Sequence, residues 1–357
     1  MKRGWMEPPA VAPARITALG NGFKAAQALL SALELGVFTA LSEGPLGLSA
    51  LRATIGIHDR GARDFLDLLV ALGMLDRDAE GRYLTTPETS IYLDRHKPTY
   101  IGDYFEFAAA REFAAWTSLT ETLRTGSPQR KSATREASAA ACEPGQSAPH
   151  YGVAYARLGG AEQMAKAMTA ATLAVAHAIA AKFPWQDYAT MLDVGTAEGC
   201  LPVQVLQRHP HLTGTGFDLL PMAPLFDAYV KRHALSSRLR FHPGSFFTGP
   251  LPGSEVLVMG RVLHNWDLAT KQMLLTKAHQ ALPPGGALIV YERLIDDARG
   301  SNTPGLISSL NMLVMTDGGF DFTGADCARW MEDAGFQRIR AEPLVDGHRW
   351  SSASNEA

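Results

Sequence analysis

Five short apolar runs alternate with helical stretches in the second half of the chain, and this alternation restricts the possible folds more than any other feature. The runs are TMLDVG, GTGFDL, LRFHPG, EVLVMGRVL and GGALIVYERL. Strands and helices that alternate in this way predict an α/β fold with a doubly wound, mostly parallel sheet. A sheet of this kind binds its ligand at the carboxyl ends of its strands. The residues that follow each run are therefore the first candidates for a functional site.

Helical spacing of apolar residues dominates the N-terminal part of the chain. It predicts one or two helices over residues 14–41, with a bend near Gly20 and Gly22. A short helix capped by Ser49 and a second helix over residues 60–72 are expected to follow.

A β-hairpin is predicted next, from two short apolar strands around residues 79–81. Helix, helix and hairpin together make a winged-helix arrangement, which often binds DNA. In the second helix, however, Arg60 and Arg63 are balanced by Asp64 and Asp67. Because phosphate binding needs uncompensated positive charge, a dimerisation or packing module is favoured over a DNA-binding regulator.

The chain is long enough for two domains, since its 357 residues exceed the size at which a single core usually stops growing. We expect a mainly helical winged-helix dimerisation domain over residues 1–124 and a ligand-binding α/β domain over residues 151–357. Residues 125–150 are rich in Ser, Ala and Pro and have almost no large apolar side chains, which is typical of a flexible linker or loop.

Charge and cysteine usage exclude several classes of protein. The formal net charge is −3, whereas nucleic-acid-binding proteins usually carry a strong basic excess. The sequence contains no run of 18 apolar residues, so no transmembrane helix is predicted. Its first residues lack the apolar segment of a signal peptide. Cys142, Cys200 and Cys327 are widely spaced, which indicates a reduced, cytoplasmic protein without a zinc cluster. We therefore expect neither nucleic acid nor a membrane as a partner.

A glycine turn follows the first run, in the sequence DVGTAEG. Gly195 and Gly199 are spaced as GxxxG rather than as the GxGxxG of a dinucleotide site, and Asp193 and Glu198 would repel a pyrophosphate. Asp218 ends the next run 25 residues further on, where an acid suits the hydroxyls of a ribose. A nucleoside with a positive group and no phosphate describes S-adenosyl-L-methionine (SAM). The alternative is an ordinary glycine turn with a solvated aspartate.

A histidine and two acids follow other runs. His264 comes just after the run EVLVMGRVL, Glu292 ends the run ALIVYE, and Asp321 lies in the glycine turn TDGGFDFTG. Carboxylates beside a histidine can orient its ring and raise its basicity, which suits removal of a proton from a hydroxyl group. The alternative for His264 is a structural, hydrogen-bonded histidine.

Several segments together resemble one known family. LDVGTAEG, GFDL, PGSFF, LHNWD, LPPGGALIVYE and GGFDFTGADCARWMEDAGF are similar to segments of the plant-type, or caffeate-like, small-molecule O-methyltransferases, which include many bacterial members. The resemblance covers nearly the whole chain. It implies a class I Rossmann-like methyltransferase domain, SAM as the cofactor, a small-molecule acceptor and a homodimer formed through the N-terminal domain.

The resemblance also implies roles for individual residues. The family's general base is the histidine of a His-Asp-Trp motif, which corresponds to His264, and its carboxylate partners correspond to Glu292 and Asp321. The residues expected to bind SAM are Asp193, Gly195, Gly199, Asp218, Leu219, Ser245, Phe246, Gly260 and Arg261. The residues expected to line the acceptor pocket are Met164, Met168, Trp266, Asn311 and Met312. Core packing explains the first two methionines equally well, and no metal is expected because no second histidine accompanies His264 at a matching turn.

The chain departs from the family pattern in several places. Ser245 stands where relatives have an aspartate that contacts the adenosine end of SAM, and Asn265 replaces the aspartate of His-Asp-Trp. Arg261 lies near the expected cleft and could pair either with a carboxylate of the acceptor or with a neighbouring acid. The last residues, VDGHRWSSASNEA, are polar where relatives end in an apolar strand, so we expect the last edge strand to be short or frayed.

The methyl acceptor stays open at this point. Some bacterial relatives are associated with methylation of small acids, at the carbon of α-keto acids or at the sulfur of methylthio-hydroxy acids in a dimethylsulfoniopropionate-type pathway. A thioether sulfur attacks without losing a proton, so His264 would then only position the substrate. We expect O-methylation of a small-molecule hydroxyl; the alternatives are S-methylation, C-methylation and a SAM-binding protein that no longer methylates.

Overall fold

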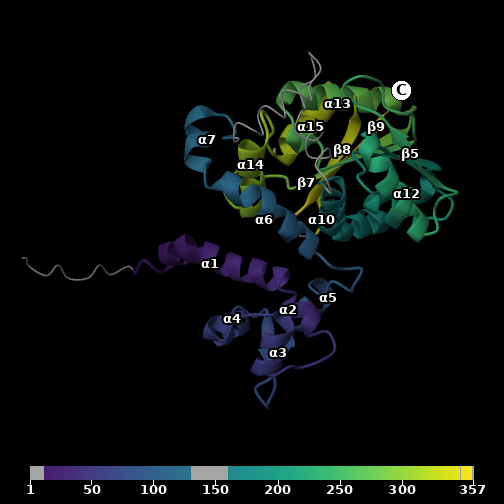
Figure 1. Cartoon of the computed structure of the whole chain (residues 1–357). Helices are drawn as coiled ribbons and strands as arrows, with labels where there is room; N and C mark the ends of the chain where they lie inside the picture. The colour runs from purple at the N-terminus through teal and green to yellow at the C-terminus, as the bar shows by residue number, and fades with distance from the viewer. Residues whose placement is uncertain (1–11, 130–159, 346, 356–357) are drawn as a thin grey trace, which may run out of the picture. The chain divides into compact units, whose positions relative to one another are not determined.

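The computed structural model describes residues 12–129, 160–345 and 347–355 of the chain. Its packing divides the chain into two units, Met1–Glu106 and Phe107–Ala357, and helix α6 (Gly102–Trp116) crosses the division. Figure 1 shows the purple helices of the first unit and the sheet of the second unit, which is drawn in teal, green and yellow.

The first unit consists of helices and one hairpin. Its elements are α1 (Ala14–Glu34), α2 (Val37–Ala40), α3 (Leu48–Ile55), α4 (Asp59–Ala71), β1 (Leu75–Arg77), β2 (Tyr83–Thr85) and α5 (Pro87–Tyr92). Helix α1 continues as one helix through Gly20 and Gly22, and the break lies instead at Gly36. Gly36 has a φ of +70°, a left-handed conformation that glycine adopts without steric cost.

The helix–helix–hairpin prediction is confirmed in this unit, with one correction at a helix start. The N-cap of α3 is Gly47, so Ser49 lies inside the helix and the expected serine cap is wrong. The N-cap of α4 is His58, whose Nδ1 accepts the backbone N–H of Arg60 at 3.1 Å. Strands β1 and β2 are antiparallel. The apolar core of the unit includes Leu33, Phe38, Leu51, Leu66, Leu69 and Tyr83.

The second unit contains a seven-stranded sheet and its covering helices. Its helices are α7 (Leu119–Thr125), α10 (Gly160–Lys182), α11 (Cys200–Arg208), α12 (Ala223–Arg232), α13 (Leu268–Ala281), α14 (Thr303–Met315) and α15 (Gly324–Asp333). Its strands are β3 (Thr190–Val194), β4 (Thr213–Asp218), β5 (Leu239–Pro243), β6 (Val256–Gly260), β7 (Gly286–Glu292), β8 (Gln337–Pro343) and β9 (Arg349–Asn355). Short 3₁₀ turns lie at Trp185–Asp187, Leu220–Met222 and Leu263–Asn265.

The division between the units falls earlier in the chain than the boundary expected after residue 124. Phe107, the sixth residue of α6, packs with Met164 and Ala167 of α10, and it belongs to the second unit. Most of the linker expected over residues 125–150, and the start of the third expected segment at residue 151, lie outside the described residues.

The strand order of the sheet is β5-β4-β3-β6-β7-β9-β8. Strands β3 to β7 are mutually parallel, and β9 runs antiparallel to both β7 and β8. The order reverses between β3 and β6, so the carboxyl ends of these two strands border a crevice. The predicted doubly wound, mostly parallel sheet is confirmed.

Side chains alternate between the two faces of the sheet, as strand geometry requires. Met191 and Ile289 belong to one apolar core together with residues of α10, α11 and α12, whereas Leu192 and Leu288 belong to a second core with residues of α13 and α15. Figure 1 shows α13 and α10 on opposite sides of the sheet. Both faces are covered, which explains why the central strands read as continuous apolar runs.

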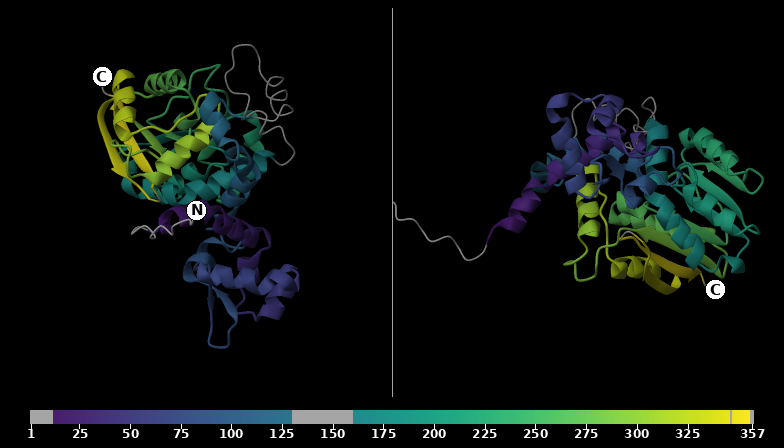
Figure 2. Two further views of the ribbon diagram at one scale, coloured as in Figure 1. Left: turned by 90° about the vertical axis from the view of Figure 1, so that its left-hand side faces the viewer. Right: turned by 90° about the horizontal axis from the view of Figure 1, so that it is seen from below.

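The C-terminal strand corrects one expectation. Strand β9 is not an edge strand, because it lies between β7 and β8 and pairs with β7 along all seven of its residues. Figure 2 shows the two yellow strands, β8 and β9, together at one end of the sheet. The polar side chains of β9 are accommodated inside: Asn355, for instance, donates from Nδ2 to the backbone oxygen of Leu282 at 2.7 Å. Small and hydrogen-bonded residues therefore give a buried strand a polar sequence.

Among the described residues, α10 alone is long and apolar enough to cross a membrane, by length and composition only. Half of its most apolar stretch is buried inside the protein, and Val175, Ala176 and Ile179 belong to the core beneath the sheet. A helix in the core of a globular domain has the same composition.

Candidate active site

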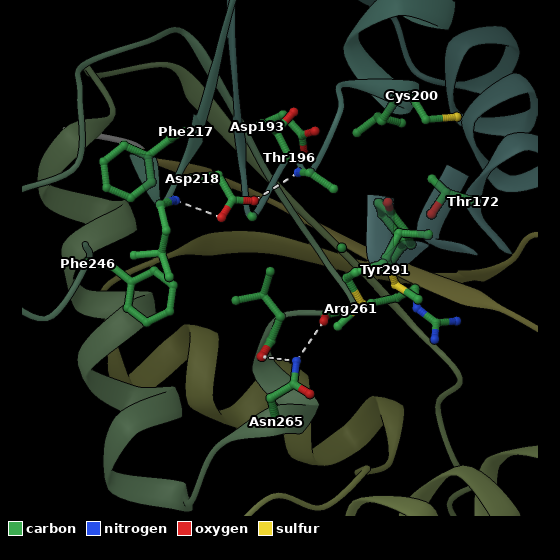
Figure 3. Close-up of a pocket in the computed structure, with 18 of the residues that line it drawn as sticks. Thr172, Asp193, Thr196, Cys200, Phe217, Asp218, Phe246, Arg261, Asn265 and Tyr291 are labelled. Atoms are coloured by element: carbon green, nitrogen blue, oxygen red, sulfur yellow. Dashed lines mark hydrogen bonds between the residues drawn. The ribbon is translucent and has the colours of Figure 1, made fainter. Parts of the chain in front are cut away.

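A cavity of about 260 Å³ lies at the carboxyl ends of β3, β4, β6 and β7. Residues of all five predicted apolar runs line it, among them Asp193, Asp218, Gly244, Arg261 and Tyr291. In Figure 3, Phe217 and Phe246 lie on one side of this cavity, and Tyr291 and Arg261 lie on the other. The sheet thus brings together side chains that are up to about a hundred positions apart in the sequence.

The turn after β3 requires glycine at two positions. Gly195 and Gly199 have φ values of +76° and +94°, so both adopt a left-handed conformation. A Cβ atom at Gly195 would lie 2.8 Å from the side chain of Val262, and a Cβ at Gly199 would lie 2.8 Å from the ring of Phe226. Both glycines are required by conformation and by space, and Gly195 also lines the cavity.

Two buried carboxyl groups lie at neighbouring strand ends. Asp218 accepts the backbone N–H of Ala197 at 2.9 Å through Oδ2 and that of Leu219 at 2.7 Å through Oδ1, as the dashed lines in Figure 3 show. Burial raises the pKa of Asp218 to about 6 and that of Asp193 to about 7. Carboxylates that are desolvated in this way favour a ligand that carries positive charge or donates hydroxyl groups.

Aromatic side chains form the wall at Phe246. The ring of Phe246 meets the ring of Trp266 edge to face, with centroids 5.6 Å apart, and Phe247 meets Trp266 at 5.0 Å. Ser245 precedes them, and its Oγ accepts the backbone N–H of Phe247 at 3.3 Å. The serine that replaces the family's aspartate therefore holds the loop that carries the aromatic rings.

Asn265 holds the turn that follows β6. Its Nδ2 donates to the backbone oxygens of Arg261 at 2.9 Å and of Val262 at 3.3 Å. An aspartate cannot donate these hydrogen bonds, so the departure from His-Asp-Trp has a structural reason here. Arg261 has a φ of +56°, which is rare outside glycine, and this strain marks the turn as a candidate functional feature. Gly260 precedes it, and a Cβ there would lie 1.8 Å from the ring of Tyr291.

His264 and two carboxyl groups converge below this turn. The Nδ1 atom of His264 lies 3.4 Å from Oδ1 of Asp321 and 3.7 Å from Oε2 of Glu292, and all three side chains are buried. Burial by itself lowers the pKa of His264, but the two carboxylates outweigh it, so the pKa lies above its usual value. Burial also raises the pKa of Glu292, to about 6. The two carboxylates lie on the Nδ1 side of the imidazole, which leaves Nε2 as the second ring nitrogen. His264, Glu292 and Asp321 are not themselves among the described residues that line the cavity.

The group of His264, Glu292 and Asp321 also has the donor atoms that a metal ion would need. One donor atom from each of His264, Glu292 and Asp321 lies within 4.8 Å of the others. A histidine with two carboxylates serves equally well as an oriented base, for which no metal is needed. The expectation that no metal binds stays a prediction.

Most of the other expected site residues line the cavity, but some do not. Met164, Met168 and Trp266 line the cavity, as do the expected SAM-binding residues apart from Gly199. Asn311 and Met312, on α14, are not among the described residues that line it. The Oδ1 atom of Asn311 instead accepts Nε1–H of Trp116, on α6, at 2.8 Å.

Several polar residues that line the cavity were not predicted from the sequence: Thr169, Thr172, Thr196 and Tyr291 are among them. Thr169 also donates from Oγ1 to Glu198 in the glycine turn, at 2.6 Å. Thr172 follows Met164 and Met168 at intervals of four residues, so the helical stripe was visible in the sequence. Tyr291 had no such signal, because its position depends on the register of β7 beside β6.

Comparisons with known proteins agree with this geometry. A model of the O-methyltransferase dimerisation domain matches residues 17–95, and a model of the O-methyltransferase domain matches residues 116–337. The chain is 42% identical over 328 residues to the tetracenomycin polyketide synthesis 8-O-methyl transferase TcmO of Streptomyces glaucescens, covering 92% of each chain. It is 32% identical to the N,N-dimethyltransferase OxyT of Streptomyces rimosus, covering 94% of each chain.

A solved structure shares the fold over the full length. The chain superposes on human N-acetylserotonin methyltransferase in complex with SAM with a TM-score of 0.86. The alignment covers 98% of this chain and all of the human one, at 24% sequence identity.

Proposed function

The chain belongs to the O-methyltransferase family with an N-terminal dimerisation domain, and we propose that it methylates a phenolic hydroxyl of a polycyclic acceptor with His264 as the general base. It is a SAM-dependent methyltransferase that acts on small molecules. Two observations support the finer proposal: the relative TcmO is an 8-O-methyl transferase of polyketide synthesis, and an aromatic wall borders the cavity. This acceptor class suits a role in secondary metabolism.

The residues of the cavity fit SAM. Asp218 would accept hydrogen bonds from the ribose hydroxyls, Leu219 and Phe246 would border the adenine, and Ser245 would hold their loop. Gly195 and Gly260 line the cavity without a side chain, and the buried carboxyl of Asp193 would lie near the positive end of the ligand. Arg261 would face the carboxylate of the methionine moiety, since it lines the cavity opposite Phe246.

Bound SAM supplies an electrophilic methyl group on a sulfonium sulfur. The acceptor oxygen forms a bond to this carbon while the carbon–sulfur bond breaks, and the proton of the hydroxyl moves to Nε2 of His264. Glu292 and Asp321 orient the imidazole from its Nδ1 side and stabilise the imidazolium that forms. Trp266, Met164 and Met168, which line the cavity, would wall the acceptor and exclude water.

The single observation that carries this proposal is the contact of His264 Nδ1 with two buried carboxyl groups. Replacing His264 by Ala should lower kcat by roughly 10²- to 10⁴-fold and leave the Kd for SAM unchanged. The kcat is measured by transfer of a labelled methyl group from SAM to a panel of polycyclic phenols. The Kd for SAM is measured by calorimetry. The exposed His177, replaced by Gln, is the matched control.

Different outcomes would point elsewhere. Loss of SAM binding together with turnover would make His264 a structural residue. Full turnover of a thioether by the His264→Ala variant would favour S-methylation. The relatives give no support to S- or C-methylation, whereas OxyT is an N,N-dimethyltransferase, so the panel should include aromatic amines.

We also propose a homodimer and a cytoplasmic location, which the same relationship supports. The dimerisation domain supports a homodimer, and the balanced charges of α4 support protein packing rather than nucleic-acid binding. Cys200 and Cys327 are free and buried, which suits a reducing cytoplasm.

A further inference from the structure

Lys271 lies on the first turns of α13 and is fully buried, with a relative exposure of 0%. Lysine is almost never fully buried without a partner, because desolvation of its ammonium group costs free energy. The function proposed above does not use this residue. Its contacts therefore call for an explanation.

The ammonium group of Lys271 links two turns of the active site. Its Nζ donates to the backbone oxygen of Trp266, which lies two residues after His264. The same Nζ lies 3.4 Å from the ring centroid of Phe320 and 5.7 Å from that of Phe322. Since these two phenylalanines flank Asp321, Lys271 connects the turn of the base to the turn of its carboxylate partner.

The positive charge of Lys271 interacts electrostatically with the carboxylates of Glu292 and Asp321. Burial lowers its pKa to about 8, and the carboxylates of Glu292, Asp321 and Asp267 act in the opposite direction. The group thus remains mostly protonated at neutral pH. Its charge is held at a fixed place in a low-dielectric interior, where Coulomb interactions are stronger than in water.

Other ionisable groups surround His264 on every side. Glu292 ends β7, Asp321 lies in the turn before α15, and Arg261 follows β6. His348, before β9, stays neutral because burial and the nearby arginines lower its pKa to about 3. The two carboxylates together would keep His264 protonated, and a base that never loses its proton cannot accept one.

We propose that Lys271 is a positioning residue of the methyl transfer: its buried ammonium group fixes Asp321 relative to His264 and offsets the negative charge of the carboxylate pair, so that His264 is neutral at the working pH. The inference rests on the proposed role of His264 as the base. It assigns to Lys271 an effect on the proton affinity of that base, which a purely structural lysine would not have.

The test measures the pKa of His264 directly, by NMR of protein labelled with 13C at histidine Cε1. Lys271→Met keeps the length and the apolar stem but removes the charge, and Lys271→Gln keeps a donor for the oxygen of Trp266. Both variants should raise the pKa of His264 by about 1 pH unit, because a nearby positive charge disfavours the imidazolium. The acid limb of the kcat–pH profile should move up by the same amount. Below that limb, kcat should fall roughly tenfold.

The exposed Lys231 on α12, replaced by Met, is the matched control and should leave both quantities unchanged. An unchanged pKa of His264 in a folded variant overturns the proposal, even if activity is lost. If neither neutral variant folds, 13C-lysine NMR of the wild-type protein decides. A Lys271 that is neutral at the pH of maximal kcat overturns the proposal, whereas a charged one that titrates together with His264 supports it.

The readout separates this inference from the function proposed above. A raised pKa of His264 without a matching shift of the kcat–pH profile would uphold the charge effect of Lys271 and reject His264 as the base. If the Lys271 variants leave the pKa of His264 unchanged while His264→Ala abolishes turnover, His264 is upheld as the base and the charge effect of Lys271 is rejected.

Discussion

The proposed contacts of SAM with Asp193 and Asp218 would couple binding of the cofactor to protonation. Burial raises their pKa values to about 7 and about 6, above the ordinary value near 4. Between pH 4 and those values the unfolded chain binds fewer protons than the folded one. The stability of the ligand-free protein should therefore fall as pH rises through this window. A ligand that needs the ionised carboxylates must displace their protons.

Because both carboxylates must be ionised, we expect SAM to bind roughly a hundredfold more weakly at pH 5.5 than at pH 7.5. Asp218→Asn should weaken binding further and flatten this dependence, since its amide NH₂ would face the N–H of Ala197 or Leu219. Calorimetry in two buffers of different ionisation enthalpy measures both the Kd and the protons released. The exposed Asp227, replaced by Asn, is the control. A Kd that is independent of pH would contradict the assignment of these two acids.

At the residue scale, the sequence revealed the groups that sit at strand ends. His264, Glu292 and Asp321 each follow a recognisable apolar run or glycine turn, and the structure brings them within hydrogen-bonding or ion-pair distance. Lys271 and Tyr291 could not be found in this way. Their place depends on how a helix or a neighbouring strand packs, which the spacing of one segment does not specify.

At the scale of elements, the apolar runs predicted the central strands β3, β6 and β7, because strands buried on both faces carry mostly apolar residues. The same rule failed for β9, which is buried but polar. Small serines and a hydrogen-bonded asparagine satisfy burial without hydrophobicity. The polar composition of β9 therefore predicted an edge strand, whereas its pairing with β7 places it inside the sheet.

The interior position of β9 gives a prediction that separates it from a frayed edge. Ala353 is 4% exposed and packs in the core beneath α13 and α15, so Ala353→Asp should lower the free energy of unfolding by more than about 2 kcal/mol. Ser352 points to the other face and is half-buried, and Ser352→Asp should cost clearly less. Urea unfolding followed by circular dichroism measures both. Equal, small effects would indicate a strand that contributes little to the sheet.

At the scale of the whole molecule, the chemistry belongs to the second unit, while the first unit bears the match to a dimerisation domain. Helix α1 exposes large apolar side chains: Ile16 is 76% exposed, Leu19 84% and Phe23 58%. They recur at intervals of three and four residues, which puts them on one face of the helix. An apolar stripe of this kind is unfavourable in water and suits burial against a second copy of the chain.

Replacing both Leu19 and Phe23 by Asp should therefore turn a dimer into a monomer, because the charges would have to be buried in the interface. Analytical ultracentrifugation at several protein concentrations gives the mass. Asn21→Asp, which adds a charge on the opposite face of α1, should leave the dimer intact. The cavity lies in the second unit, so the monomer should still bind SAM; whether it also turns over acceptor then shows if a partner chain completes the acceptor pocket. A double variant that remains fully dimeric would place the interface elsewhere on the first unit.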